Sequence, residues 1–115
     1  MPFIRCTTNQ QYSDELKSAF KSKCGQLISI IPGKSEDGLM VMIEDGQNML
    51  FRGKDLPCMK VSVEMYTSAR YDDKKNFAEA LLKAIVEMTG IPYDNIYMNF
   101  SEFDIWSDGP TLKRE

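Results

Sequence analysis

The chain contains no histidine, and this absence excludes several kinds of catalytic site. Without histidine there is no Ser-His-Asp or Cys-His nucleophile, and the commonest ligand of catalytic zinc is missing. The sequence also has no glycine-rich phosphate-binding loop. If the chain is an enzyme, its base must therefore be a carboxylate, a lysine, a tyrosine or the N-terminal amine.

Basic stripes, long apolar runs and paired cysteines are scarce as well. The net charge is −3 and no dense lysine or arginine stripe occurs, so we expect no nucleic-acid partner. No apolar run approaches the roughly 20 residues of a membrane-spanning helix, and no signal peptide is visible. Three widely spaced cysteines, Cys6, Cys24 and Cys58, fit neither a disulfide framework nor a zinc motif. They predict reduced, buried thiols in a cytoplasmic protein that has no metal site.

What is present is an ordinary globular composition, with 115 residues of which 43% are hydrophobic and 27% charged. We therefore expect one domain, residues 1–115. Apolar residues recur at three- and four-residue steps over 16–31 and 77–88, which predicts two amphipathic helices. Ser13 is expected to cap the first helix, and Asp72 or Asp73 the second. Alternation of apolar and polar residues predicts strands at 2–8, 39–43, 48–51, 57–65 and 96–101.

The two halves of the chain repeat the same plan, as pseudo-repeats of about 2–52 and 57–106. Matching residues recur at offsets of 55, 57 and 57: Pro2 with Pro57, Gly33 with Gly90, and Asp37 with Asp94. This pattern predicts an α/β (α+β) fold in which a β-α-β unit is duplicated. Its four strands would form one mixed sheet with both helices on one face. Because parallel strand pairs are normally covered on both faces, we expect a second subunit to cover the other face.

Several blocks of residues, spread over the whole chain, resemble the tautomerase superfamily, specifically the macrophage migration inhibitory factor and D-dopachrome tautomerase family. The matching blocks are Met1-Pro2-Phe3-Ile4, Thr8-Asn9, Gly33-Lys34 with Asp37, Pro57-Cys58, Ile96-Tyr97-Met98-Asn99-Phe100, and Trp106. Their order and spacing carry the resemblance, because no single block is specific. One family feature is absent, since Cys58 is followed by Met59, Lys60 and Val61 and no Cys-x-x-Cys pair exists.

The resemblance implies a homotrimer whose active sites lie between neighbouring subunits. It implies a keto–enol tautomerase of the phenylpyruvate or dopachrome type, which acts on small α-keto or enol carboxylates without a cofactor or metal. By position, Pro2 would be the general base once Met1 is removed, Lys34 the cation for the substrate carboxylate, and the backbone of Tyr66 a polar contact. Tyr97 and Asn99 would reach in from the adjacent subunit, with Phe3 and Trp106 as walls.

The residue types suit this chemistry. An α-amine has a pKa of about 7.7–8.0, closer to neutrality than a lysine side chain, and an apolar pocket with a nearby cation lowers it further. Hydrogen-bond donors such as Tyr97 and Asn99 can stabilise a developing enolate oxygen. Without the resemblance, Lys34 could instead be a charge at a helix C-terminus, and Tyr97 and Asn99 the solvent face of a strand. Trp106 could be a core or interface anchor.

Two other functions stay open at this point. One is a decarboxylase or dehalogenase of the same superfamily that uses the same Pro2. The other is a cytokine-like protein, exported without a signal peptide, whose vestigial pocket has no catalytic role and whose surface binds a protein receptor. The second function should survive Pro2→Gly, whereas a tautomerase should not.

Overall fold

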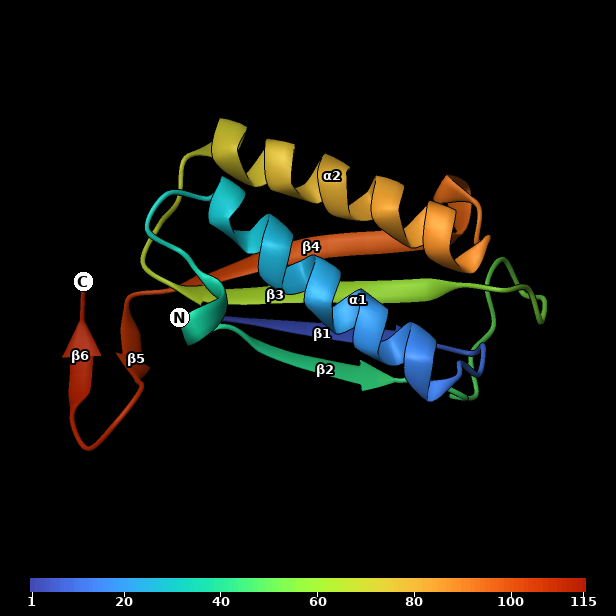
Figure 1. Ribbon diagram of the computed structural model, residues 1–115, viewed down its shortest axis with the longest axis horizontal. Helices are drawn as coiled ribbons and strands as arrows, with labels where there is room; N and C mark the ends of the chain where they lie inside the picture. The colour runs from blue at the N-terminus through green and yellow to red at the C-terminus, as the bar shows by residue number, and fades with distance from the viewer.

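A four-stranded sheet carries two helices on one face, and a small hairpin extends beyond one end of that sheet (Figure 1). The computed structural model describes residues 1–115. The strands are β1 (Pro2–Thr8), β2 (Met40–Glu44), β3 (Met59–Tyr66), β4 (Ile96–Phe103), β5 (Ile105–Ser107) and β6 (Leu112–Arg114). The helices are α1 (Asp14–Leu27) and α2 (Tyr71–Thr89), with short 3-10 turns η1 (Ile28–Ile30), η2 (Glu36–Gly38) and η3 (Tyr93–Asn95).

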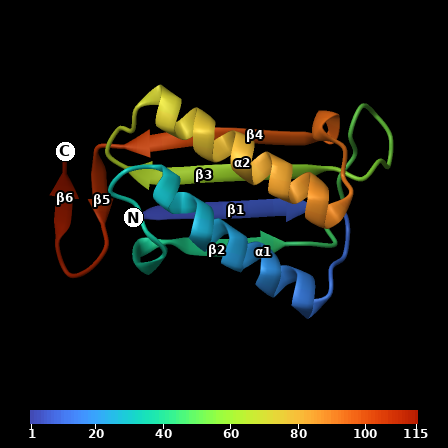
Figure 2. The same ribbon diagram turned by 45° about the horizontal axis from the view of Figure 1, so that its top comes forward.

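The order of the sheet is β2-β1-β3-β4, and it confirms the duplicated β-α-β unit. β1 runs parallel to β2, and β3 runs parallel to β4, so each half of the chain makes one crossover through a helix. The two halves meet where β1 pairs antiparallel with β3, and Pro2 lies opposite Met65 in that register. The N-terminus therefore lies at the end of the sheet from which the β5–β6 hairpin projects (Figure 2).

The hydrophobic core lies between the sheet and the helices. Burial alternates along β1 and β3, so that Ile4 and Val63 point toward the helices. They belong to one cluster with Phe20 from α1 and Phe77 from α2. Each such side chain contributes roughly 1.5–3 kcal/mol when it is fully buried. Neither helix has the length and apolar content needed to cross a membrane.

The three cysteines belong to the buried part of the fold. Cys6, Cys24 and Cys58 are all buried and free, as the sequence predicts. Burial raises the pKa of the Cys6 and Cys24 thiols to about 12, because a low-dielectric environment disfavours the thiolate. These two thiols are therefore protonated at neutral pH and are not nucleophiles.

The helix starts follow the prediction in one case and depart from it in the other. Ser13 caps α1, and its hydroxyl accepts a hydrogen bond from the Leu16 N–H at 3.1 Å. The expected cap of α2 is wrong, because Arg70 holds the N-cap position and makes no side-chain bond there. Asp72 and Asp73 lie instead inside the first turn, where the helix dipole favours negative charge.

Two predicted strand boundaries also change. The expected strand at 48–51 does not form, and the segment makes only an isolated bridge between Phe51 and Lys54. Neither sheet of the structure includes these residues, so they have no strand to pair with. β3 begins at Met59 and not at Pro57, since the Cys58 N–H donates to the side chain of Asn9 at 3.1 Å. Local hydrogen bonds from a loop side chain therefore decide where the ladder starts.

The second face of the sheet is uncovered in the chain and carries polar side chains. Arg5 Nε donates to Glu44 Oε1 at 2.6 Å, and the Thr7 hydroxyl donates to the same oxygen at 3.1 Å. This contact raises the pKa of Arg5 and lowers the pKa of Glu44. The uncovered face is therefore ordered and charged around Arg5, while Met40 and Met42 of β2 are exposed apolar side chains on the same face.

Candidate active site

A cavity of about 390 Å³ opens where β1 begins. Three of the residues predicted from the sequence line it: Pro2, Phe3 and Trp106. The other lining residues are Met1, Asp37, Gly38, Met40, Ser107 and Asp108. The cavity thus combines an N-terminal segment, an aromatic wall and two carboxylates from loops that are distant in sequence.

Pro2 is held rigidly at this cavity because it is the first residue of β1. Its side chain is buried, and its backbone lies opposite Met65 of β3. Proline is compatible with this position, since the first residue of a strand does not have to donate to the ladder. The fold therefore fixes the ring of Pro2 while leaving its nitrogen beside Met1, at the cavity wall.

Trp106 is presented to the cavity by the β5–β6 hairpin. In the hairpin it pairs with Lys113, and Lys113 forms an ion pair with Asp108 at 3.0 Å across the turn. The ring of Phe103 lies 6.0 Å from the ring of Trp106, centre to centre. Trp106 is therefore a cavity wall and no member of the buried core.

Lys34 lies in the loop between η1 and η2, and its side chain reaches the last residue of β3. Its Nζ donates to the backbone carbonyl oxygen of Tyr66 at 3.0 Å, so two residues that were each expected to contact the substrate contact one another. Lys34 also lines a second cleft of about 430 Å³ between residues 31–34 and 67–70. Thr67, which follows that carbonyl, has a φ of 67°, a left-handed conformation that is costly for a β-branched residue.

The electrostatics at this end of the sheet favour a neutral amine. Burial lowers the pKa of the Met1 amine below its ordinary value of 8.0, and the charge of Lys34 lowers it further. Asp108 acts in the opposite direction, while Lys113 reinforces the effect of Lys34. An amine placed here is therefore deprotonated at a lower pH than an ordinary N-terminus.

Tyr97 and Asn99 lie elsewhere in the chain. Both point from β4 to the uncovered face and are exposed. Tyr97 pairs with Lys60, and Pro2 pairs with Met65, which is five positions further along β3. At roughly 3.3 Å per residue, these positions are about 17 Å apart along the strand. One chain does not bring these side chains to the Pro2 cavity.

Tyr97 nevertheless has a defined environment. Its ring packs edge-on against Phe51 at 5.4 Å, and the guanidinium of Arg52 lies 5.1 Å from the centre of the Phe51 ring. Edge-to-face pairs of this kind contribute roughly 0.5–1.5 kcal/mol beyond burial. The segment that was expected to form a strand at 48–51 thus supports a predicted site residue.

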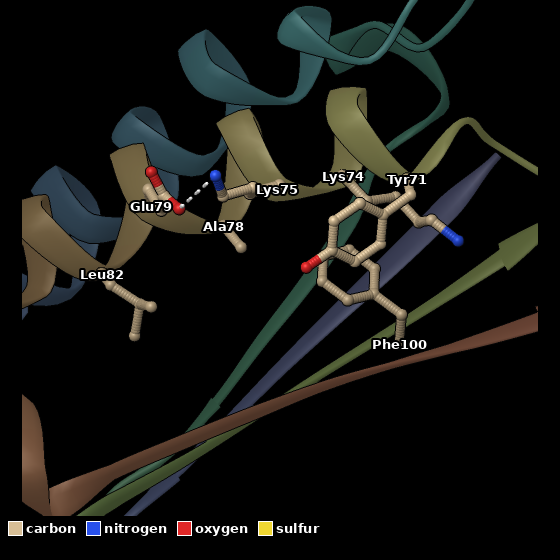
Figure 3. Close-up of a pocket in the computed structure, with 7 residues that line it drawn as sticks. All are labelled: Tyr71, Lys74, Lys75, Ala78, Glu79, Leu82 and Phe100. Atoms are coloured by element: carbon tan, nitrogen blue, oxygen red, sulfur yellow. Dashed lines mark ion pairs between the residues drawn. The ribbon is translucent and has the colours of Figure 1, made fainter.

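A further pocket of about 420 Å³ lies between α2 and β4, away from all of these residues. Tyr71 and Phe100 supply its aromatic surface, and an ion pair between Lys75 and Glu79 at 3.8 Å crosses its rim (Figure 3). Most of its surface is apolar, and its one carboxylate, Glu79, is paired with Lys75 at the exposed rim. We therefore place the candidate active site at the Pro2 cavity.

Sequence reasoning missed two carboxylates of this cavity, Asp37 and Asp108. Asp37 belongs to the internal repeat and to the family resemblance but has no expected role at the site, and the β5–β6 hairpin that carries Asp108 is not predicted from the sequence. The signal was present as Asp108-Gly109, a dipeptide typical of hairpin turns, between Trp106 and Leu112.

Comparison with known proteins agrees with this fold. The family model described as macrophage migration inhibitory factor (MIF) matches residues 1–111. A macrophage migration inhibitory factor homolog of Brugia malayi is 25% identical over 104 residues, which cover 90% of each chain. The crystal structure of Leishmania major MIF2 has a TM-score of 0.89 with 23% identity and covers 97% of each chain. A solved member of the cis-3-chloroacrylic acid dehalogenase family has a TM-score of 0.80 with 11% identity, and covers 97% of this chain and 84% of its own.

The duplicated β-α-β fold is therefore shared with the solved structure of Leishmania major MIF2. The family match over residues 1–111 is decisive, and the chain belongs to the macrophage migration inhibitory factor family.

Proposed function

We propose that the protein is a keto–enol tautomerase in which the amine of Pro2, freed by removal of Met1, is the general base. The observation that carries the proposal is the placement of Pro2, buried at the first position of β1 and lining a cavity with Phe3 and Trp106. The proposed substrate is a small α-keto or enol carboxylate, whose carboxylate would reach Lys34 in the second cleft because the Pro2 cavity itself is lined by Asp37 and Asp108 and by no cationic side chain. No cofactor or metal takes part in the proposed reaction.

The base has the right environment for work near neutral pH. Acid–base catalysis is most efficient when the pKa of the catalytic group lies near the working pH, and it contributes roughly 10²–10⁴-fold. Burial and Lys34 lower the pKa of the amine of Met1. The nitrogen of Pro2 is one residue further along the same wall, so the same two influences act on it once Met1 is absent. With Met1 attached, that nitrogen is an amide and has no usable lone pair.

The proposed reaction is a proton transfer in two steps. The nitrogen of Pro2 takes a proton from the carbon next to the carbonyl. The electron pair of the broken C–H bond forms a C=C bond, and the π pair of the C=O bond moves to the oxygen to form an enolate. The protonated nitrogen and neighbouring donors stabilise this charge until a proton is returned. Lys34, which is already tied to the Tyr66 carbonyl at 3.0 Å, has further N–H donors for the substrate carboxylate.

We further propose that the enolate donors come from another copy of the chain. Tyr97 and Asn99 lie about 17 Å and about 10 Å along the strand from the position opposite Pro2, so they belong to a different site within one subunit. A homotrimer would place the exposed Tyr97 and Asn99 of one subunit at the Pro2 cavity of the next. The uncovered face of the sheet would then be enclosed by the assembly.

The test is ketonisation of phenylpyruvate, followed by ultraviolet absorbance, on protein whose intact mass confirms the loss of Met1. We expect turnover by the native protein and loss of at least about 10²-fold in Pro2→Gly, with Lys75→Met as a surface control that keeps its activity. Because glycine still offers a primary α-amine at this position, equal activity of Pro2→Gly and native protein would show that the secondary amine of proline is not required and would contradict the role given to Pro2. If Met1 is absent and no turnover occurs, the function moves to another reaction of the superfamily or to receptor binding.

A further inference from the structure

Three polar side chains form a connected group on the uncovered face of the sheet. Lys60 Nζ donates to the hydroxyl of Ser62 at 2.7 Å and to Asn99 Oδ1 at 2.8 Å. The register explains the contact, because Ser62 lies directly opposite Asn99 and Lys60 lies opposite Tyr97. Lys60 therefore reaches diagonally from β3 to the next strand, a distance that a long side chain spans easily.

The contact fixes which way the amide of Asn99 faces. An ammonium group has three donors and no acceptor, so only the carbonyl oxygen of the amide can face it. The NH₂ group of Asn99 consequently faces away from Lys60, and no atom of the chain accepts a hydrogen bond from it. Without Lys60, the amide could turn over and present its oxygen, which repels an enolate, in place of its NH₂.

The contact also polarises the amide. Lys60 makes no ion pair, and the nearby Arg5 and Glu44 are occupied with each other at 2.6 Å. Glu64, which lies two positions beyond Ser62 on the same face, forms no ion pair either. A charged donor makes a shorter and stronger hydrogen bond than a neutral one, and a bond to the amide oxygen makes the NH₂ protons better donors. Lys60 therefore acts on Asn99 through both orientation and charge.

We propose that Lys60 is a positioning residue that holds the amide of Asn99 with its NH₂ group directed outward, ready to donate to an anionic oxygen of the substrate. The inference rests on the proposed function, in which Asn99 stabilises the enolate. Lys60 itself does not touch the substrate. Ser62 takes the second hydrogen bond of the ammonium and keeps the lysine side chain flat on the sheet.

A double-mutant cycle tests the dependence on Asn99. Loss of an oxyanion donor costs roughly 10²–10³-fold, so Asn99→Ala should lower kcat/KM for phenylpyruvate by up to that amount. Lys60→Met should lower it by about tenfold, within the range of couplings between residues in contact. Lys60→Arg, which still donates, should keep most of the activity, and Lys75→Met controls for the loss of one surface charge. In the Asn99→Ala background, Lys60→Met should have no further effect.

Three outcomes would overturn the inference. The first is that Lys60→Met is as active as the native protein. The second is that Lys60→Met costs the same with and without the Asn99 side chain, which would show that the lysine acts elsewhere. The third is that the native enzyme turns over and Asn99→Ala is equally active, because Asn99 would then have no donor role for Lys60 to support.

A structural readout keeps the inference separate from the proposed activity. In a two-dimensional ¹⁵N–¹H spectrum, the side-chain amide signal of Asn99 is identified by its absence in Asn99→Ala. We expect Lys60→Met to shift this signal and Lys60→Arg to leave it close to its native place. If the native protein shows no tautomerase activity, the proposed function fails, and this spectrum still decides on the positioning. An unchanged Asn99 signal in Lys60→Met would contradict it.

Discussion

Replacement of Lys34 by methionine removes the ammonium group that is hydrogen-bonded to the end of β3, one residue beyond Met65, which lies opposite Pro2. Lys34 Nζ donates to the Tyr66 carbonyl at 3.0 Å, which holds the ammonium in place and leaves two donors for a substrate carboxylate. A hydrogen bond between charged groups contributes roughly 1.5–3 kcal/mol, and 1.36 kcal/mol corresponds to a factor of ten. We therefore expect Lys34→Met to lower kcat/KM by roughly 10- to 150-fold. Most of the loss should appear as a higher KM, because the carboxylate is bound in both ground state and transition state.

The same substitution should move the pH profile. Lys34 lowers the pKa of the N-terminal amine of Met1, second in size only to burial. A base is active when it is deprotonated, so kcat/KM falls on the acidic side of its pKa. Removing Lys34 raises that pKa, and the acidic limb of the profile should therefore move to higher pH. Lys34→Arg retains the charge and should leave the limb near its native position.

Both effects can be measured in one set of experiments. Initial rates of phenylpyruvate ketonisation are recorded from pH 5 to 9 for the native protein, Lys34→Met, Lys34→Arg and the surface control Lys75→Met. Circular dichroism and intact mass establish that each variant is folded and lacks Met1. An unchanged KM in Lys34→Met, or an acidic limb that moves to lower pH, would refute the role given to Lys34.

Three further predictions concern stability, measured by urea or thermal unfolding at one protein concentration. Thr8→Val leaves the buried Cys58 carbonyl without its 2.8 Å donor and should cost about 1–3 kcal/mol, more than Thr8→Ser, which keeps the hydroxyl; equal stability would contradict this. Lys74 lowers the pKa of Glu102, so the advantage of native protein over Glu102→Gln should be full above pH 4.5 and shrink as the pH falls below it. Thr67→Gly removes the strain of a φ of 67°, so it should raise the free energy of unfolding by up to about 1 kcal/mol and raise the melting temperature with it. A lower melting temperature would argue against strain at Thr67.

Much of the fold follows from the sequence because burial leaves a periodic trace. The three- and four-residue spacing of apolar residues over 16–27 and 77–88 matches the faces of α1 and α2 that enter the core. The predicted helix over 16–31 extends too far, because α1 ends at Leu27 and Ile28–Ile30 form the 3-10 turn η1. The Ser13 cap and the end of α2 at Gly90, whose φ is 76°, are likewise local features that a sequence states directly.

The departures occur where tertiary contacts decide the outcome. β3 starts at Met59 because the amide of Asn9, far away in sequence, holds the Cys58 N–H. α2 begins at Tyr71 with Arg70 as its N-cap, two or three residues before the acidic residues that were expected to cap it. The β5–β6 hairpin has short strands with exposed residues, and so it lacks a hydrophobic pattern.

The candidate site was visible in the sequence only through the resemblance to a family. No periodicity distinguishes Pro2 from any second residue, and the cavity that surrounds it is formed by segments about a hundred residues apart. The contact between Lys60 and Asn99 depends on the parallel register of β3 and β4, which a sequence does not fix. Roles that depend on register or on another subunit therefore need the structure.

If the free amine of Pro2 is the base, activity must depend on removal of Met1, which can be tested on two products that differ only in that residue. Two fusion proteins are cleaved by a protease so that one product begins at Pro2 and the other keeps Met1, with intact mass as proof. Phenylpyruvate ketonisation is then measured on both under identical conditions. We expect turnover by the product that begins at Pro2 and at least about 100-fold less by the product that keeps Met1. Equal turnover by the two products would contradict it.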